Sequence, residues 1–203
     1  MSNTFIIMAL PNALSEIFQC IDQKQDEFIE RFNEAISVSA NAEKSQDTTG
    51  VIEWVDKLLK SLGFFTELKN VEVVKLDGAI HSTSVIFGSS AAGHCPNKST
   101  ILIYCHFGFT GIQKEDELGN HLQNNNFYGN GILDLSSIIA WLNTIEVFET
   151  SKIDKPVNIK FIISPKETES NTGLSNLLIS EKDCFLESKE CPPGERNMAV
   201  MKK

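Results

Sequence analysis

Two apolar runs constrain the fold of this chain of 203 residues more than any other feature. Residues 100–105 (TILIYC) form a continuous apolar run, as in a strand buried on both faces, and residues 157–163 (VNIKFII) form a second buried strand. Between them, residues 132–148 have the length and apolar content of a helix. This alternation of strand and helix predicts an α/β fold, with a mostly parallel sheet flanked by helices.

Further elements are predicted on both sides of this unit. Apolar residues recur at helical spacing over residues 14–38, and residues 51–62 form a second amphipathic helix that ends at Gly63, a favourable C-cap. Three short β-rich runs and a last helix are predicted at residues 64–68, 71–76, 84–87 and 173–179. Two stretches of small and polar residues are predicted loops, 39–50 and 88–99.

The length and composition fit one domain with a core, followed by a tail. We predict an N-terminal extension at residues 1–13 and the domain itself at residues 14–184. Residues 185–203 contain paired prolines, a glycine and no apolar period, and are predicted to be a disordered tail.

Charge and cysteine content indicate which partners and which cellular location to expect for the chain. The net charge is −9, with no run of five or more like charges, and both phosphate backbones and anionic membrane surfaces need basic patches, so neither is expected as a partner. No apolar stretch approaches the roughly 18 residues of a membrane span, and no secretory leader is evident. The cysteines are odd in number and contain no Cys-x-x-Cys pair, so reduced thiols and a cytoplasmic location are expected. They are Cys20, Cys95, Cys105, Cys184 and Cys191.

Three residues that suit a zinc or manganese site follow predicted strands or turns. His106 follows the strand TILIYC, Asp134 follows a glycine turn, and Glu167 follows the strand VNIKFII. Each has a simpler interpretation: His106 as a polar cap of its strand, Asp134 as the N-cap of the following helix, and Glu167 as a solvated surface residue. From composition and spacing alone, both interpretations stay open.

Four segments resemble, in order and spacing, the cytosolic non-specific dipeptidases and carnosine dipeptidases, which are aminoacylase-like two-metal peptidases. They are IDQKQDEFIERFNEAISVSA, TILIYCH, NNFYGNGILDLSSIIAWLNTIEVFE and KPVNIKFII. The similarity runs from about Ile17 to about Phe185. It implies the N-terminal part of a zinc-peptidase-like catalytic domain, incomplete and without the lid and dimerisation domain. It also implies a dipeptide substrate and two Zn or Mn ions.

The family's first motif, His-x-Asp, reads His106-Phe107-Gly108 in this chain. The resemblance assigns metal binding to His106, whereas the carboxylate that orients the site is lost at Gly108. The second motif keeps its bridging metal ligand as Asp134, but the family's two basic residues and last glycine are absent.

The third motif, Glu-Glu, reads Glu167-Thr168 in this chain. Glu167 keeps the position of the general base, and Thr168 replaces a metal-binding glutamate. A one-residue bulge could instead bring in Glu169. The family's later Asp and His ligands have no counterpart, because no Asp follows Asp183. We therefore expect that the two-metal site does not form.

Three functional hypotheses follow. In the first, the chain is an inactive dipeptidase relative, either a pseudoenzyme or a truncated product. In the second, it is an active metallodipeptidase whose site is completed by a full-length homologue. In the third, it is a non-enzymatic interaction module that recruits strands of other chains through an exposed sheet edge.

Overall fold

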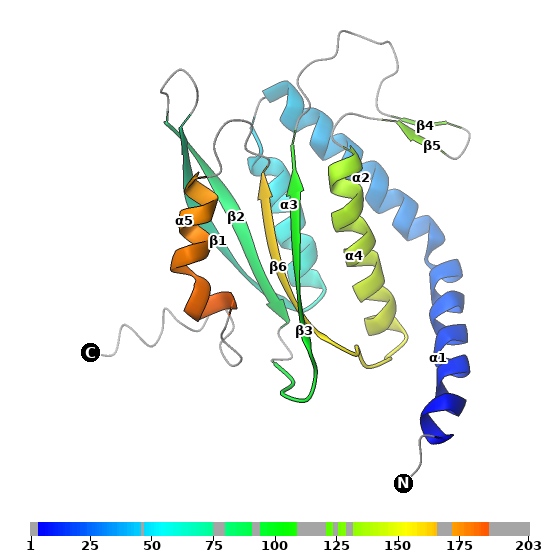
Figure 1. Cartoon of the computed structure of the whole chain (residues 1–203). Coiled ribbons are helices and arrows are strands. Elements are labelled where there is room, and N and C mark those ends of the chain that lie inside the picture. Colours follow the sequence, from blue (N-terminus) through cyan, green and yellow to red (C-terminus); the bar gives the residue numbers. More distant parts are fainter. Residues whose placement is uncertain are drawn as a thin grey trace.

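The computed structural model of the chain shows a sheet with helices on both faces (Figure 1). In several segments, among them residues 4–11 and 132–134, the description covers the backbone alone. The described residues are 4–45, 47–74, 80–90, 94–108, 121–123, 126–128, 132–165 and 172–186.

The main sheet has four strands in the order β1-β2-β6-β3, and a separate two-stranded sheet pairs β4 with β5. The strands of the main sheet are β1 (Phe64–Val74), β2 (Ile80–Ser90), β6 (Asn158–Pro165) and β3 (Thr100–Phe107). The short strands are β4 (His121–Gln123) and β5 (Asn126–Tyr128).

Strand directions confirm part of the predicted topology. β3 and β6 are parallel, as predicted for the two apolar runs, so the α/β class with flanking helices is confirmed. β2 runs antiparallel to both β1 and β6, however, so the described sheet is mixed and the expectation of a mostly parallel sheet was wrong. The reason is local: β1 and β2 follow each other after a few residues, and so short a connection can only join antiparallel strands.

Helices α3 (Thr49–Ser61) and α4 (Ile132–Thr150) confirm two predicted helices. The C-terminus of α3 also follows the prediction, because Gly63 has a φ of 75° and its N–H donates to the carbonyl of Lys60 at 3.1 Å. That left-handed conformation suits glycine, which has no Cβ to clash.

The N-terminal helices differ from the prediction. Two helices, α1 (Thr4–Gln23) and α2 (Gln25–Ser45), replace the single helix expected at residues 14–38, and the loop predicted from residue 39 is helical through Ser45. Helix α2 contacts both α3 and α4, and Ala42 is buried there. Burial of Ala42 against these helices therefore adds to the high helical propensity of alanine, which the prediction of a loop overlooked.

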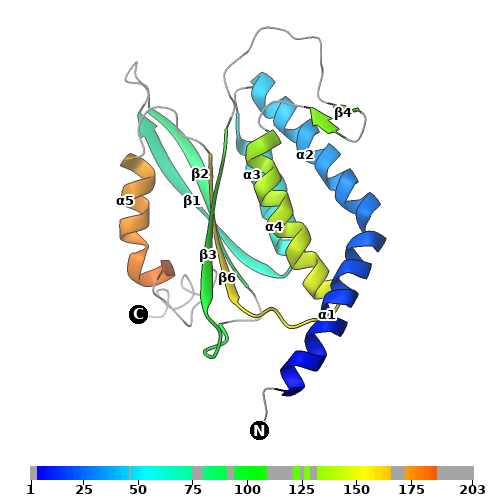
Figure 2. The ribbon, with the colours of Figure 1, turned by 45° about the vertical axis from the view of Figure 1, so that its right-hand side comes forward.

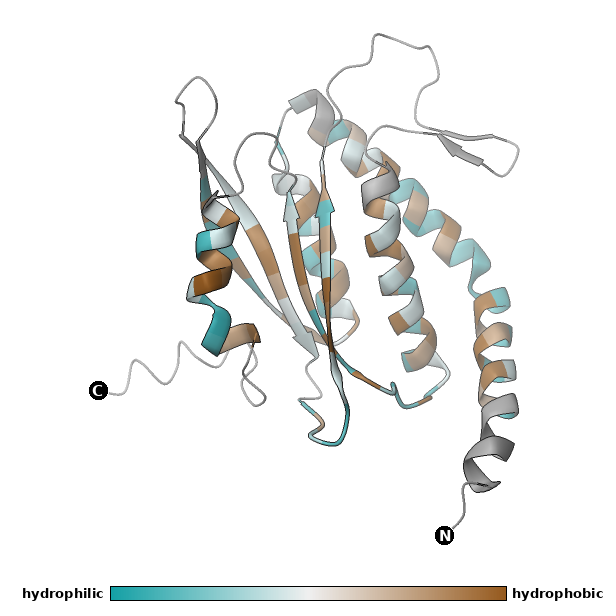
Figure 3. Cartoon of the chain, in the orientation of Figure 1, coloured by the Kyte–Doolittle hydropathy of each residue, from teal (hydrophilic) through white to brown (hydrophobic). Residues whose placement is uncertain are grey.

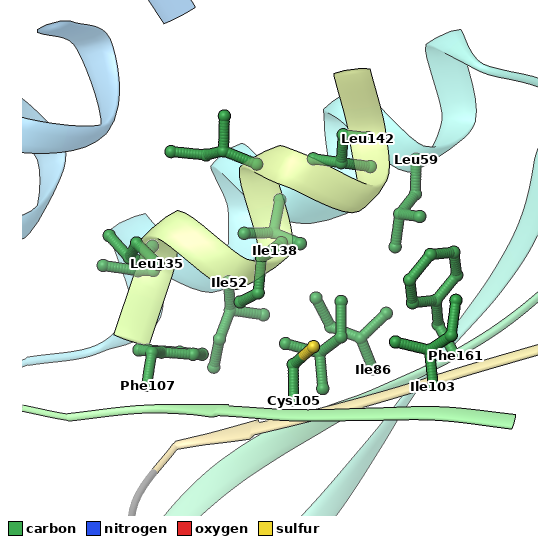
Figure 4. Packing of buried hydrophobic residues seen from close by; sticks show 14 of the residues in the cluster. Ile52, Leu59, Ile86, Ile103, Cys105, Phe107, Leu135, Ile138, Leu142 and Phe161 are labelled. Carbon is green, nitrogen blue, oxygen red and sulfur yellow. The ribbon is translucent and has the colours of Figure 1, made fainter. Parts of the chain in front are cut away.

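The larger part of the core lies between the sheet and helices α3 and α4. Figure 4 shows Leu135, Ile138 and Leu142 of α4 facing Cys105 and Phe107 of β3 across an apolar interface. All five side chains are at least 93% buried. Burial of a large apolar side chain contributes about 1.5–3 kcal/mol, so this layer is the main source of stability.

A smaller cluster covers the opposite face of β1 and β2. Helix α5 (Thr172–Ser180) and the short π-helix η1 (Lys182–Leu186) pack there, with Phe185 edge-on to Phe87 at a centroid distance of 4.8 Å. Helix α5 approaches β1 so closely that a Cβ at Gly173 would lie 2.5 Å from the carbonyl oxygen of Glu72.

The predicted domain boundaries fall inside these elements. Helix α1 crosses the boundary at residue 13. Phe185, the first residue of the predicted tail, is 2% exposed in η1, so the packed part of the chain continues to Leu186. The rest of the predicted tail, residues 187–203, lies outside the described residues. None of the described helices is both long and apolar enough to cross a bilayer.

Candidate functional site

The parallel pairing of β3 with β6 brings two predicted site segments to the same edge of the sheet. His106 pairs with Ser164, and Phe107 pairs with Pro165, at the carboxyl ends of both strands. The first turn of α4 lies at this end as well, because Leu135 packs beside Phe107 (Figure 4). Carboxyl ends of strands are where open α/β sheets bind ligands, so His106 lies at a place in the fold that suits a site.

His106 is exposed at the end of β3. Because strand residues alternate between faces, its imidazole lies on the face opposite to buried Cys105 and Phe107. It shares that outer face with Tyr104, and the centroids of the two rings are 6.2 Å apart. Gly108 follows directly after β3 and is buried. The position at which the resemblance predicts a carboxylate is therefore buried, and it carries no side chain.

Asp134 lies inside the first turn of α4, which begins at Ile132. The interpretation of Asp134 as an N-cap was therefore wrong, since the N-cap residue precedes the helix. The side chain of Asp134 lies outside the described part of the structure, and so do Glu167, Thr168 and Glu169. Their predicted roles stay predictions.

The described side chains at this edge supply one candidate metal ligand, His106, whereas those of Asp134 and Glu167 lie outside the described part of the structure. Across the part of the chain that the structure describes, no group of three or more His, Cys, Asp or Glu side chains could hold a metal ion. Beside His106, the hydroxyl of Ser164 is fully buried and donates to the carbonyl of Pro165 at 3.0 Å. A zinc site usually takes about three protein ligands for each catalytic metal, and this described set offers a single imidazole.

The thiol nearest to the site is inert. Cys105 is 7% exposed in the main core, and this burial raises the pKa of its thiol. A thiol that stays protonated is a poor nucleophile. Cys105 therefore acts as a small apolar side chain of the core.

A charge network that the sequence interpretation missed lies near the other end of α4. Glu146 accepts a hydrogen bond from Lys24 at 2.8 Å and another from Arg31, which also donates to Asn143. The charged side chains of this network are 14–15% exposed. They connect the junction of α1 and α2 to α4, so we assign the network to helix packing and not to the candidate site.

Two opposing effects act on Glu146. Burial is the largest single influence and raises its pKa, but the hydrogen bonds and the charges of Lys24 and Arg31 together outweigh it, so the pKa lies below the ordinary value for a glutamate. The pKa of Lys24 is raised, chiefly by its hydrogen bond to Glu146. The one sequence signal for this network was a glutamate within the otherwise apolar run IEVF.

Curated proteins similar to this chain are metallodipeptidases and dipeptidases. The chain is 26% identical over 190 residues to the Cys-Gly metallodipeptidase dug1 of Schizosaccharomyces pombe, covering 88% of this chain and 40% of that protein. It is 28% identical over 191 residues to the Beta-Ala-His dipeptidase of Homo sapiens, covering 86% of this chain and 37% of that protein. No family model matches the chain.

Solved structures agree with this similarity. Human carnosine dipeptidase 1 superposes with a TM-score of 0.69 at 26% identity, covering 86% of this chain and 39% of that one. The di-peptidase Dug1p of Saccharomyces cerevisiae gives a TM-score of 0.70 at 20% identity, with the same coverage, and shows the shared fold.

The resemblance predicted from the sequence is therefore confirmed: this α/β chain is similar in sequence to the Cys-Gly and Beta-Ala-His dipeptidases, and similar in fold to human carnosine dipeptidase 1. It spans about two-fifths of the length of the curated relatives that it matches.

Proposed function

We propose that this chain is a metallodipeptidase-like protein whose hydrolysis of dipeptides is lost or severely impaired when it acts alone. The observation that carries the proposal is the sequence at the end of β3, where exposed His106 is followed by buried Gly108. Glycine has no carboxylate to orient a metal-binding site. Loss of such an orienting partner typically lowers metal affinity or activity by about 10–100-fold.

The remaining family positions support the same proposal. His106 and Asp134 are too few to hold two metal ions, and Thr168 offers a neutral hydroxyl in place of a glutamate. Glu167, at the general-base position, would need an activated water to act on. Zn or Mn would be the expected ions, by resemblance to the relatives, and a dipeptide the expected substrate.

Metal content and activity test this proposal together. The purified chain should contain well below one Zn or Mn per chain by mass spectrometry of the metals. It should not hydrolyse Cys-Gly or β-Ala-His above the blank, even with added Zn²⁺ or Mn²⁺. Stoichiometric metal together with hydrolysis would refute the proposal.

A restored variant sharpens the test. The double variant Gly108→Asp/Thr168→Glu should bind more metal than the wild type, because it returns two carboxylates to the site. Adding His106→Ala to that variant is the matched control and should abolish the gain. If the double variant binds no more metal than the wild type, the lost carboxylates do not explain the loss of the site.

A specific observation favours a second candidate, an interaction module or a partner subunit of a full-length dipeptidase. Strand β3 lies at the edge of the described sheet and contains no Lys, Arg, Asp or Glu. Its outer face exposes Leu102 by 47% and Tyr104 by 52%. Such edges pair readily with strands of other chains unless charges block them.

Co-expression with a full-length dipeptidase homologue tests this candidate. A hetero-oligomer should co-purify, and Leu102→Lys should weaken it by placing a charge on the outer face of the edge strand. Absence of a complex, or a complex unchanged by Leu102→Lys, would refute it.

We also infer a cytoplasmic location, where thiols stay reduced. Among the described cysteines, Cys20, Cys95, Cys105 and Cys184 are free thiols. A fluorescent fusion at the C-terminus, imaged in live cells, tests this inference, and a signal confined to the secretory pathway would contradict it.

A further inference from the structure

The loop that leads into strand β3, residues 94–99, is fastened to the start of β6 by Asn158. We call it the entry loop. The Oδ1 atom of Asn158 accepts a hydrogen bond from the N–H of Cys95 at 2.9 Å. Its Nδ2 donates to the carbonyl oxygens of Lys98 at 2.9 Å and of Cys95 at 3.0 Å. The backbone N–H of Asn158 donates to the carbonyl oxygen of Ser99 at 2.9 Å. Both ends of one amide group therefore hold the backbone of the loop.

The entry loop lies at the end of the sheet opposite to the candidate site. Figure 1 shows it at the amino end of β3, whereas His106 lies near the other end of that strand. Figure 3 shows hydrophilic colour over part of the loop, in contrast to the hydrophobic bands along β3. Among the described strands, β3 is an edge strand that pairs with β6 alone. The attachment of its first residues therefore depends on the entry loop.

The same amide nitrogen also faces the ring of His94. The Nδ2 atom of Asn158 lies 3.1 Å from Nδ1 of His94. The backbone fixes the orientation of this amide, because a reversed amide would place its oxygen against two carbonyl oxygens and its nitrogen against the N–H of Cys95. An amide NH₂ group can only donate, so Nδ1 of His94 accepts and bears no proton. His94 is consequently neutral in this arrangement, with its proton on Nε2.

We propose that His94 and Asn158 form a proton-sensitive latch, which holds the entry loop while His94 is neutral and loosens it when His94 is protonated. Both ring nitrogens of an imidazolium carry protons, so an N–H of His94 would then face an N–H of Asn158. Rotation of the ring does not relieve this conflict, because neither nitrogen is left as an acceptor. The ring has to leave Asn158, and the adjoining backbone of Cys95 loosens with it. This inference goes beyond the proposed function and does not depend on it.

The surroundings of His94 offer the imidazolium no compensating charge within the described part of the chain. The other titratable groups at this corner are Cys95, Lys98 and Asp154. Asp154 lies in the connection between α4 and β6, and its carboxylate is engaged in an ion pair with Lys98. The described partner of His94 is the amide of Asn158, which carries no charge. Histidine is the side chain that ordinarily changes charge between about pH 5 and 8, so the latch should respond within that range.

Nuclear magnetic resonance of the full chain tests the charge state of His94. Long-range correlation between ring protons and ring nitrogens at about pH 7.5 should show the tautomer with its proton on Nε2 and a lone pair on Nδ1. A proton on Nδ1 at this pH would overturn the inference, because Asn158 would then face a donor.

Hydrogen exchange at the amide of Cys95 tests the latch itself, since this N–H donates to Asn158. Its protection factor, which is corrected for the intrinsic exchange rate, should fall about two- to tenfold between about pH 7.5 and about pH 5.5, as expected for the loss of one hydrogen bond. The amide of Phe161, in the central strand β6, should keep its protection. An unchanged Cys95 amide would overturn the latch, and so would an equal fall at Phe161, which would assign the effect to the whole sheet.

Two variants of His94 separate its hydrogen bond from its titration. His94→Asn places an amide oxygen near the position of Nδ1, so it should keep the protection of Cys95 at neutral pH and remove the pH dependence. His94→Phe has no acceptor, so protection should be about two- to tenfold lower at every pH. His106→Gln is the matched control, because it removes the exposed histidine at the other end of β3 and should leave the fall intact. A fall of wild-type size in His94→Asn, or its loss in His106→Gln, would refute the assignment to His94.

Discussion

The two faces of the main sheet are covered very differently. Helices α3 and α4 cover one face along all four strands, whereas α5 and η1 cover the other face mainly over β1 and β2. Figure 2 shows the sheet nearly edge-on with α5 on one side and α3 and α4 on the other. One face therefore forms a continuous core, and the other is packed over only part of its width.

The parallel strands β3 and β6 differ in burial because the two faces of the sheet are covered unequally. The second half of β6, from Phe161 to Pro165, is buried on both faces. The edge strand β3 alternates, with Ile103 and Cys105 buried but Leu102 and Tyr104 exposed. The prediction that TILIYC is buried on both faces was thus wrong for β3. An apolar composition permits burial on both faces, but a second layer of chain must be present to provide it.

The largest expected effect comes from the covered face. Leu142 is fully buried between α4 and the sheet, so Leu142→Ala should lower the free energy of unfolding by about 3–4 kcal/mol through lost burial and a cavity. Urea denaturation measures this change. The same substitution on the other face, Leu102→Ala, is the matched control and should change stability by only about 0.5 kcal/mol.

Equal losses for the two leucines would contradict the comparison, because they would show that the outer face of β3 is covered in solution. A smaller loss at Leu142 would show that α4 repacks around the cavity.

The second effect concerns the attachment of α1 and α2 to α4, on the side of the sheet that α3 and α4 cover. Glu146→Gln removes the carboxylate that Lys24 and Arg31 share, so it should destabilise the fold by about 1–3 kcal/mol at neutral pH. Glu146 has a lowered pKa in the folded state. Its contribution is therefore present above the unfolded pKa of about 4.3 and is lost as the pH falls through the folded value.

Denaturation curves from about pH 7 to pH 3 should consequently converge for wild type and Glu146→Gln at the acid end. Glu149→Gln is a suitable control, because Glu149 is half-exposed and pairs with Lys155 near the surface. A gap between wild type and Glu146→Gln that stays constant with pH would contradict the assigned charge state.

The smallest expected effect comes from the partly covered face. Phe185→Leu keeps an apolar side chain but removes the edge-on contact with Phe87 and the cation–π contact with Lys160, so we expect a loss of about 1 kcal/mol. Hydrogen exchange should show faster opening of α5 and η1 while α4 keeps its protection. Uniformly faster exchange across the chain would show that the two faces unfold as one unit.

Much of the fold was predictable from local pattern. The apolar runs of β3 and β6, the long helix α4, and Gly63 at the end of α3 were recognised because local chemistry specifies each of them. The break at Lys24 was not recognised from the sequence; in the structure, Lys24 pairs with Glu146, which lies far along the chain.

The candidate site also combines features that the sequence predicts with features that depend on tertiary contacts. The sequence by itself predicted the resemblance to the dipeptidases, from four ordered segments, and it predicts a site short of carboxylates, because Gly108 and Thr168 have none. The tertiary structure alone decided that His106 and Ser164 share one sheet edge, that Leu102 and Tyr104 are exposed, and that Phe18 projects from α1. Residue type is local information, whereas pairing and burial depend on which distant segments arrive at the same place.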